Sequence, residues 1–175
     1  MRNMPLFSII FILLCGSFTS LLALSPGDTV RPAEIRDAHN KPMMIPSLGE
    51  KPVLIFYPDP DVPNQNKNFS EAMKKTNFPP ARFAGMGIVN LKDAPFIPDS
   101  LIRFMIRREI EADKRAVIYT DPDRLLQKAW RLGDCNNKFV IILIDKNMKV
   151  LFIKKGEMTQ EEIDRVIGLI REMVK

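Results

Sequence analysis

The sequence predicts an α/β protein with a mixed central sheet, helices on both faces and an N-terminal β-hairpin. Short apolar runs with strand composition alternate with stretches of helical periodicity, which is typical of parallel strands joined by helices. A last pair of strand-like runs is joined by a tight turn at residues 145–148 and must pair antiparallel. The chain of 175 residues is long enough for one domain with a sizeable core.

The composition is that of an ordinary globular protein, with 46% hydrophobic and 27% charged residues. The formal net charge is +5, but Lys and Arg alternate with Asp and Glu along the chain. Nucleic-acid binding requires a dense basic stripe, which this pattern lacks. We therefore expect no nucleic-acid partner.

Residues 1–23 have the pattern of a secretory signal peptide. Arg2 supplies a positive start, residues 6–14 form an apolar core, and small residues follow. We expect this segment to be removed and residues 24–175 to form a single exported domain. Two alternatives remain open, which are lipidation at Cys15 and retention of the segment as an uncut membrane anchor.

The start of the exported domain predicts a hairpin and then a buried strand. Residues 30–35 and 41–45 are short extended runs, and residues 37–40 between them have turn composition. Residues 53–58 form a continuous apolar run that suits a strand buried on both faces. The run ends at Pro58, because proline lacks the N–H that a strand ladder needs.

Helices and strands then alternate through the middle of the chain. We expect a helix from residue 68 or 70 to residue 76, a strand at residues 83–91, and a helix at residues 101–112. Asp99 or Ser100 is expected to cap that second helix. Its core stripe is predicted to comprise Leu101, Ile102, Met105, Ile106 and Ile110.

The pattern continues with a third parallel strand and two further runs that pair with the sheet. Residues 116–119 form the third strand, and the next helix is expected to begin at residues 121–123 and to end at Gly133. Residues 139–144 are a second fully buried run, and residues 149–153 return beside it.

The C-terminal helix has a clear start signal. Thr159 is followed three residues later by Glu162, which is the spacing of a capping box. Apolar residues then recur at helical spacing on one face, which comprises Ile163, Val166, Ile167, Ile170 and Val174. The sequence therefore predicts that the chain ends on an amphipathic helix packed against the sheet.

This order of elements resembles the thioredoxin fold in its peroxiredoxin-like or TlpA-like form, with residues 26–28, 53–58 and 142–145 as further landmarks. Within that superfamily the chain resembles the YtfJ family of periplasmic proteins of unassigned function. The resemblance is best from residue 88 onward and includes residues 156–162 before the last helix. It implies a thioredoxin-like fold over the exported domain and a periplasmic location.

The resemblance also aligns residues 61–64 with the Cys-x-Pro-Cys motif of thioredoxins. Pro63 matches the motif proline, but Asp61 and Asn64 stand at the two cysteine positions. Dithiol exchange needs an attacking thiolate and a resolving thiol, so this chemistry is excluded at the motif. The turn also lacks a peroxidatic cysteine, and residues 133–138 lack the proline that the superfamily carries before its next strand.

The corner after the central strand is the predicted binding site, with Asp59, Asp61, Pro63 and Asn64 as its residues. Ligands of open α/β sheets sit at the carboxyl ends of strands. Prolines stiffen this turn, and a preorganised surface loses less entropy on binding. We expect the corner to face residues 133–137 and to bind an exported protein partner, with no enzyme activity and no cofactor.

Cys135 is the one thiol that remains if Cys15 leaves with the signal segment. A single cysteine cannot form an internal disulfide, and Asp134 beside it would raise its pKa. We expect an inert residue. Two alternatives stay open: a redox protein that acts through Cys135, and a regulatory protein, which requires that the N-terminal segment does not direct export.

Two Asp-Pro-Asp turns bring four carboxylates near the carboxyl ends of strands: Asp59, Asp61, Asp121 and Asp123. Such oxygens suit a hard cation like Ca²⁺. Each turn is also a good helix-start signal. The resemblance to the thioredoxin fold implies that the strand at residues 116–119 lies at the sheet edge, two places from the central strand. We therefore predict no metal site.

The remaining polar candidates are interpreted as solvated side chains. His39 is the sole histidine and lies in the predicted hairpin turn, where no nucleophile or orienting partner is legible. Arg103, Arg107 and Arg108 are spaced about one turn apart on the polar side of their helix. They are interpreted as a solvated face that an anionic partner could use.

Overall fold

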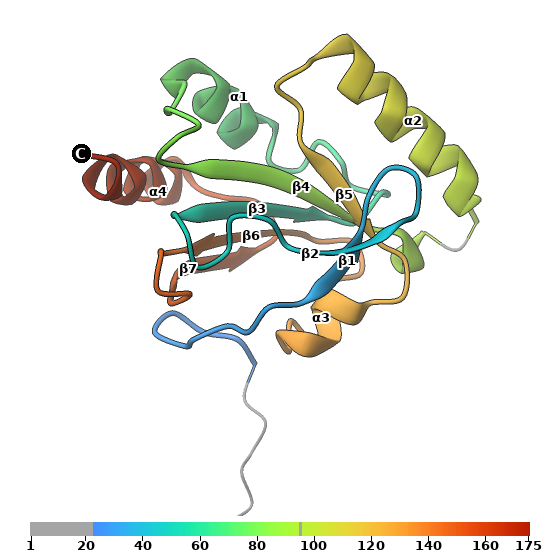
Figure 1. Cartoon of the computed structure of the whole chain (residues 1–175), viewed down its shortest axis with the longest axis horizontal. Coiled ribbons are helices and arrows are strands. Elements are labelled where there is room, and N and C mark those ends of the chain that lie inside the picture. The colour runs from blue at the N-terminus through green and yellow to red at the C-terminus, as the bar shows by residue number, and fades with distance from the viewer. Residues whose placement is uncertain (1–22, 95) are drawn as a thin grey trace, which may run out of the picture.

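The structure is a computed structural model that describes residues 23–94 and 96–175 of the chain (Figure 1). The predicted signal segment lies outside the described residues except for Ala23. Within the described part, no helix is both long enough and apolar enough to cross a membrane.

A seven-stranded mixed sheet forms the centre of the domain, in the order β2-β1-β5-β4-β3-β6-β7. In chain order the strands are β1 (Glu34–Arg36), β2 (Pro42–Met44), β3 (Val53–Pro58), β4 (Ala84–Asn90), β5 (Ile118–Asp121), β6 (Phe139–Ile144) and β7 (Val150–Lys155). The three middle strands β3, β4 and β5 run parallel, whereas β6, β7 and the hairpin strands pair antiparallel. The predicted mixed sheet and N-terminal hairpin are confirmed.

The hairpin changes the position of β5 in the sheet. Strand β1 pairs with β5 through Arg36 and Thr120, and β2 lies beyond it. The expectation that the third parallel strand forms the sheet edge was therefore wrong. The hairpin covers the edge of β5 that would otherwise be unpaired. The short strand β2 therefore forms the edge of the sheet instead.

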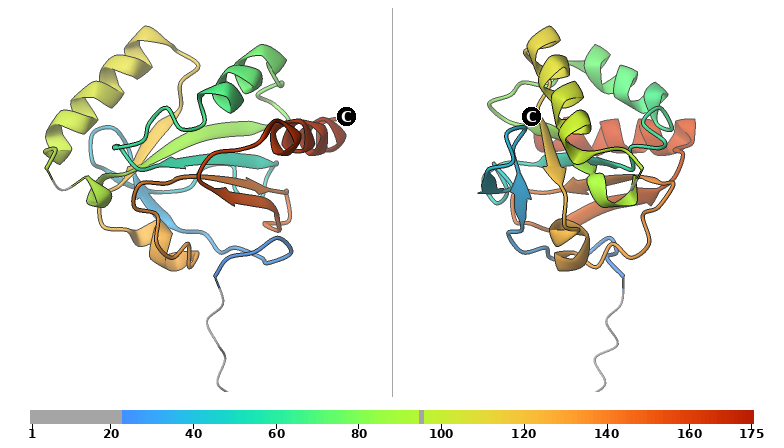
Figure 2. Two further views of the ribbon diagram at one scale, coloured as in Figure 1. Left: turned by 180° about the vertical axis from the view of Figure 1, so that it is seen from behind. Right: turned by 90° about the vertical axis from the view of Figure 1, so that its right-hand side faces the viewer.

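Helices cover both faces of the sheet, as predicted (Figures 1 and 2). The helices α1 (Lys67–Thr76), α2 (Asp99–Ala112) and α4 (Gln160–Met173) lie on one face, and the short α3 (Leu125–Ala129) lies on the other. A single 3₁₀ turn, η1 (Leu91–Asp93), follows β4. The predicted capping box at the start of α4 is present, because Thr159 and Glu162 each accept the other's backbone N–H.

The continuous apolar runs of β3 and β6 have a simple packing explanation. Leu54 contributes to the core under α1 and α4, whereas its neighbours Val53 and Ile55 contribute to the core on the α3 side. Strand β6 alternates in the same way, and all six of its residues are buried. A strand between two helical layers must be apolar on both faces, so its sequence shows a run rather than an alternation.

The structure corrects the predicted face of α2. Leu101 and Met105 are 48% and 61% exposed, whereas Ile102, Arg103 and Ile106 are the buried residues of the helix. The helix packs on Leu91 and its neighbours through a narrow stripe. The apolar side chains beside this stripe, Leu101 and Met105, are therefore left partly exposed to solvent. The helix also begins at Asp99, with Pro98 at the N-cap position, so neither Asp99 nor Ser100 caps it.

Candidate functional site

The corner between β3 and α1 is held in place by the buried carboxylate of Asp59, which is 1% exposed. Its backbone N–H donates to the carbonyl of Lys138 at 3.1 Å. Its carboxylate accepts from the N–H of Asp61 at 2.8 Å and from the N–H of Asn137 at 2.6 Å. Asp59 therefore ties the corner to the loop that precedes β6, as the expected facing arrangement requires.

Two amide side chains fix the rest of the corner. The side-chain carbonyl of Gln65 accepts from the N–H of Phe139 at 2.8 Å. Asn66 is buried and donates to the carbonyl of Gly156 at 3.0 Å, while its side-chain oxygen accepts from the N–H of Met158 at 2.9 Å. The corner is thus bonded to the segments before β6 and after β7, which makes it a preorganised surface.

The four predicted binding residues fall into two groups. Asp59 is buried and bonded to backbone, whereas Asp61, Pro63 and Asn64 are exposed. The exposed surface of the corner therefore presents a carboxylate, a proline ring and an amide. Their role in binding a partner remains a prediction.

Cys135 lies in the loop that faces the corner, but its thiol is not presented to solvent. The residue is 1% exposed and belongs to the hydrophobic cluster that includes Trp130 and Leu132. Burial raises the pKa of the Cys135 thiol to about 11, although the nearby Lys155 ammonium lowers it in part. The reactive thiolate is therefore a minor form at neutral pH.

A buried polar network that the sequence analysis did not identify lies at the carboxyl ends of the parallel strands. The Tyr57 hydroxyl at the end of β3 donates to the Asp121 carboxylate at the end of β5, at 2.9 Å. Asp121 also accepts from the backbone N–H groups of Leu125 at 2.7 Å and Gln127 at 3.2 Å. Burial raises the pKa of Asp121 above its ordinary value.

Asp121 also explains where α3 begins. The sequence predicted a helix start at residues 121–123, but Asp121 is the last residue of β5 and α3 begins at Leu125. Its carboxylate binds the first free amides of the helix from four residues away, which is a capping role from a strand end.

The network continues beside β4, where the Asn90 side chain donates to the carboxylate of Asp93 and to the side-chain carbonyl of Gln127. Arg124 pairs with the other oxygen of Asp93, and Gln127 donates to the carbonyl of Gly133 at 2.6 Å. These groups border an open pocket of about 330 Å³, whose lining is Lys92, Asp93, Arg124, Gln127, Gly133, Asp134 and Asn136.

The structure does not bring the two Asp-Pro-Asp turns together as a metal site. Asp59 and Asp121 are each occupied by backbone hydrogen bonds, and Asp61 and Asp123 are exposed. Among residues 23–94 and 96–175, no group of three or more His, Cys, Asp or Glu side chains is placed to hold a metal ion.

Solved structures with this architecture define the class of protein. The pneumococcal exposed lipoprotein thioredoxin from Streptococcus pneumoniae matches with a TM-score of 0.58 and 12% identity, over 81% of this chain and 99% of its own. A peroxiredoxin-like protein from Aquifex aeolicus matches with a TM-score of 0.58 and 15% identity, over 87% of this chain and 90% of its own. The chain has a thioredoxin-like fold.

The family is shown by sequence. Residues 60–173 match the family described as "Bacterial protein of unknown function (YtfJ_HI0045)", and the chain belongs to this family. An uncharacterized protein of Haemophilus influenzae is 24% identical over 110 residues, and uncharacterized protein YtfJ of Escherichia coli K12 is 28% identical over 115 residues. Each match covers 63% of this chain and 59% of the relative, so the chain spans under two thirds of these relatives' length.

Asp59 and Asp61 form a matched pair for testing the corner. We expect Asp59→Ala to lower the free energy of unfolding by roughly 2–3 kcal/mol, because it removes two buried hydrogen bonds to a carboxylate. Asp61→Ala removes an exposed side chain and should change stability by less than about 0.5 kcal/mol. Urea unfolding of both variants measures the difference, and equal effects would show that Asp59 does not hold the corner.

The Tyr57–Asp121 hydrogen bond predicts a pH-dependent effect. Because this bond lowers the pKa of Asp121 against the larger effect of burial, Tyr57→Phe should raise that pKa further. A carboxyl whose pKa is raised by folding favours the folded state at acid pH and loses that contribution as the pH rises through the folded pKa. We therefore expect Tyr57→Phe to cost about 1–3 kcal/mol at pH 7 and less at pH 4.

Urea unfolding at both pH values measures this cost. Tyr119→Phe is the control, because Tyr119 is the chain's other tyrosine and lies half-buried in β5. A cost for Tyr57→Phe that is the same at pH 7 and pH 4 would contradict a role for ionised Asp121 in this bond.

Proposed function

We propose that the protein is an exported, periplasmic binding module that uses the thioredoxin fold without dithiol chemistry. The observation that carries the proposal is the combination of hydrogen bonds and residue types at the corner. Asp59 bonds it to the loop before β6, while Asp61 and Asn64 occupy the positions aligned with the motif cysteines. Oxygen and amide groups accept and donate hydrogen bonds but do not exchange disulfides.

The geometry of the corner favours binding a protein partner. Asp61, Pro63 and Asn64 are exposed on a turn whose backbone is fixed at both ends by Asp59 and Gln65. A surface that is ordered before binding loses less conformational entropy when a partner docks. The exposed carboxylate and amide would supply the polar contacts that fix the partner's register.

Export rests on the sequence of residues 1–23. The positive start, apolar core and small residues of this segment form the pattern that secretory signals share. The alternative of a regulatory protein requires that residues 1–23 do not direct export, so that the protein stays inside the cell. The location of the protein therefore separates these two proposals.

The alternative of a redox protein acting through Cys135 is weaker. Its thiol is buried in an apolar cluster, and its pKa is raised to about 11. Both features lower the population of thiolate that reaches solvent, and thiol exchange proceeds through the thiolate.

Capture from the periplasmic fraction tests the proposal. The full chain, with its own N-terminal segment and a C-terminal tag, is expected in that fraction together with at least one co-purified protein. Replacing both Asp61 and Asn64 by Ala should reduce this capture roughly tenfold or more, as loss of central interface contacts does. The control is the double replacement of Asp123 and Asn147 by Ala, which are exposed residues elsewhere on the domain.

The control variant should retain the same protein at the wild-type level. Recovery of the tagged chain in the cytoplasm would contradict export. Equal capture by the corner variant and the control would show that the corner is not the binding surface.

A further inference from the structure

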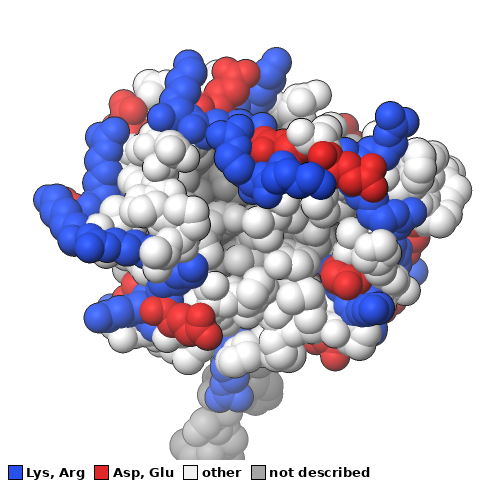
Figure 3. All heavy atoms as spheres, turned by 45° about the horizontal axis from the view of Figure 1, so that its top comes forward, with Lys and Arg blue, Asp and Glu red and all other residues white. Residues whose placement is uncertain are grey.

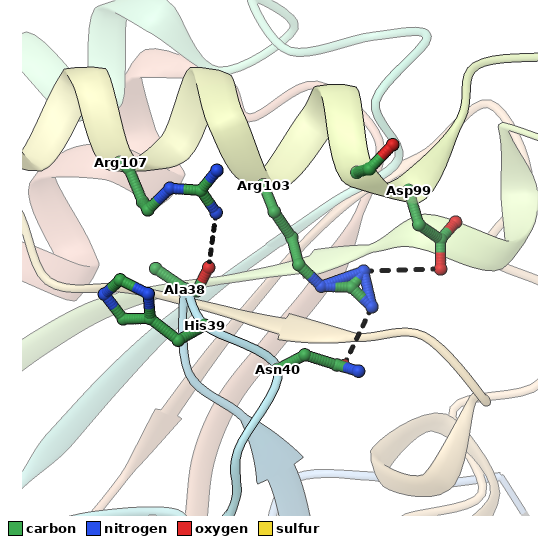
Figure 4. Close-up of a pocket in the computed structure, with 7 residues that line it drawn as sticks. Ala38, His39, Asn40, Asp99, Arg103 and Arg107 are labelled. Atoms are coloured by element: carbon green, nitrogen blue, oxygen red, sulfur yellow. Dashed lines mark hydrogen bonds and ion pairs between the residues drawn. The ribbon is translucent and has the colours of Figure 1, made fainter.

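A second pocket lies between α2 and the β1–β2 turn, and it shares no lining residue with the corner or with the smaller pocket. It has a volume of about 610 Å³ and is open to solvent. Its lining is Ala38, His39, Asn40, Asp99, Ser100, Arg103 and Arg107 (Figure 4). The first three residues belong to the hairpin turn and the others to the first turns of α2.

Arg103 is an unusual residue for a helix surface, because it is only 9% exposed. One terminal nitrogen of its guanidinium donates to the side-chain oxygen of Asn40 at 2.8 Å, and the other to Asp99 at 3.4 Å (Figure 4). Its Nε is buried and has no hydrogen-bond partner among the residues that the structure describes. A guanidinium has five N–H donors, so most of its hydrogen-bonding capacity is unused.

Arg107 lies one helical turn further along and is held in a similar way. It is half-buried and donates to the carbonyl of Ala38 at 2.9 Å. Figure 4 shows its guanidinium and that of Arg103 on the same side of α2, both turned toward the hairpin turn. The interpretation of this run as a solvated face was therefore wrong for Arg103, which is buried, whereas Arg107 is half-buried and Arg108 is exposed.

The charges of the pocket do not balance. Two guanidinium groups face it against one lining carboxylate, Asp99, which pairs with Arg103 at 3.4 Å and has a side chain that is 50% exposed. Asp37 lies in the same turn but outside the lining, and one of its carboxylate oxygens accepts from the backbone N–H groups of His39 and Lys41. Placing a buried cation without a full counter-charge is costly, so the pocket favours an added anion.

The surface around the pocket does not extend this charge into a broad basic field. Figure 3 shows Lys and Arg side chains interspersed with Asp and Glu over the face that carries α1 and α2. A local pair of fixed guanidinium groups fits one small charged group rather than an extended polyanion.

We propose that this pocket binds a phosphate or carboxylate group of a small anionic ligand, with Arg103 and Arg107 as its main ligands. The planar forks of two arginines one turn apart match the oxygens of such groups, and both forks are positioned by the hairpin turn before the anion arrives. Ser100 and His39 line the pocket and supply further polar contacts. The proposal does not depend on the function assigned to the corner.

Titration of the ¹⁵N-labelled protein with inorganic phosphate at low ionic strength tests the proposal by NMR, with sodium chloride as the control for ionic strength. We expect saturable shifts of the amides of residues 38–40 and 99–107 and of the arginine Nε–H signals. Arg107→Gln should weaken phosphate binding about tenfold or more, because it removes a charge-assisted contact. Arg108→Gln should bind as the wild type does, because Arg108 lies on the exposed side of α2 over the Phe104 ring.

Shifts that do not saturate, or an equal loss of binding in Arg107→Gln and Arg108→Gln, would overturn the proposal. Arg103→Gln risks unfolding, so the half-buried Arg107 carries the test, and thermal unfolding of each variant verifies that it is folded. A parallel titration with acetate distinguishes carboxylate from phosphate. Sedimentation with phosphatidylglycerol vesicles, against phosphatidylcholine vesicles, distinguishes a lipid phosphate from a soluble one.

Discussion

One buried carboxylate determines what the centre of this domain can do. Asp59 follows the central strand β3 and bonds the chain to the loop before β6, because its N–H donates to the carbonyl of Lys138 and its carboxylate accepts from the N–H of Asn137. These hydrogen bonds fix the corner without a disulfide, and Asp61 and Asn64 occupy the positions aligned with the two motif cysteines. In the function that we propose, this polar corner holds a partner, and its motif positions carry no thiol for disulfide exchange.

The N-terminal hairpin forms one wall of the pocket that we propose binds an anion. By pairing with β5, it covers an edge strand and brings the turn at residues 37–41 against α2. Asp121 at the end of β5 is buried, where it bonds to Tyr57 and organises the start of α3. The corner follows β3, the polar network joins the ends of β3 and β5, and the arginine pocket lies beside the β1–β2 turn.

Local signals in the sequence were sufficient for much of the fold. The apolar runs of β3 and β6 and the Thr159–Glu162 capping box depend on neighbouring residues, so they could be predicted with nearly correct bounds. The orientation of α2 could not, because helical periodicity does not say which flank of an amphipathic helix meets the core. Asn90 and Gln127 are brought together only when β4 pairs with β5, and Arg103 is buried only because the hairpin turn covers it.

Turnover of insulin disulfides measures whether the corner can exchange disulfides, since the positions that carry cysteines in a dithiol protein here carry Asp61 and Asn64. Two proteins would be compared in the presence of dithiothreitol: the Cys15→Ser variant, which keeps Cys135, and the double variant Cys15→Ser and Cys135→Ser. We expect neither protein to reduce insulin faster than dithiothreitol alone. Turnover above that rate by the protein that keeps Cys135 would contradict the absence of dithiol chemistry. Loss of that turnover in the double variant would assign the activity to the buried thiol.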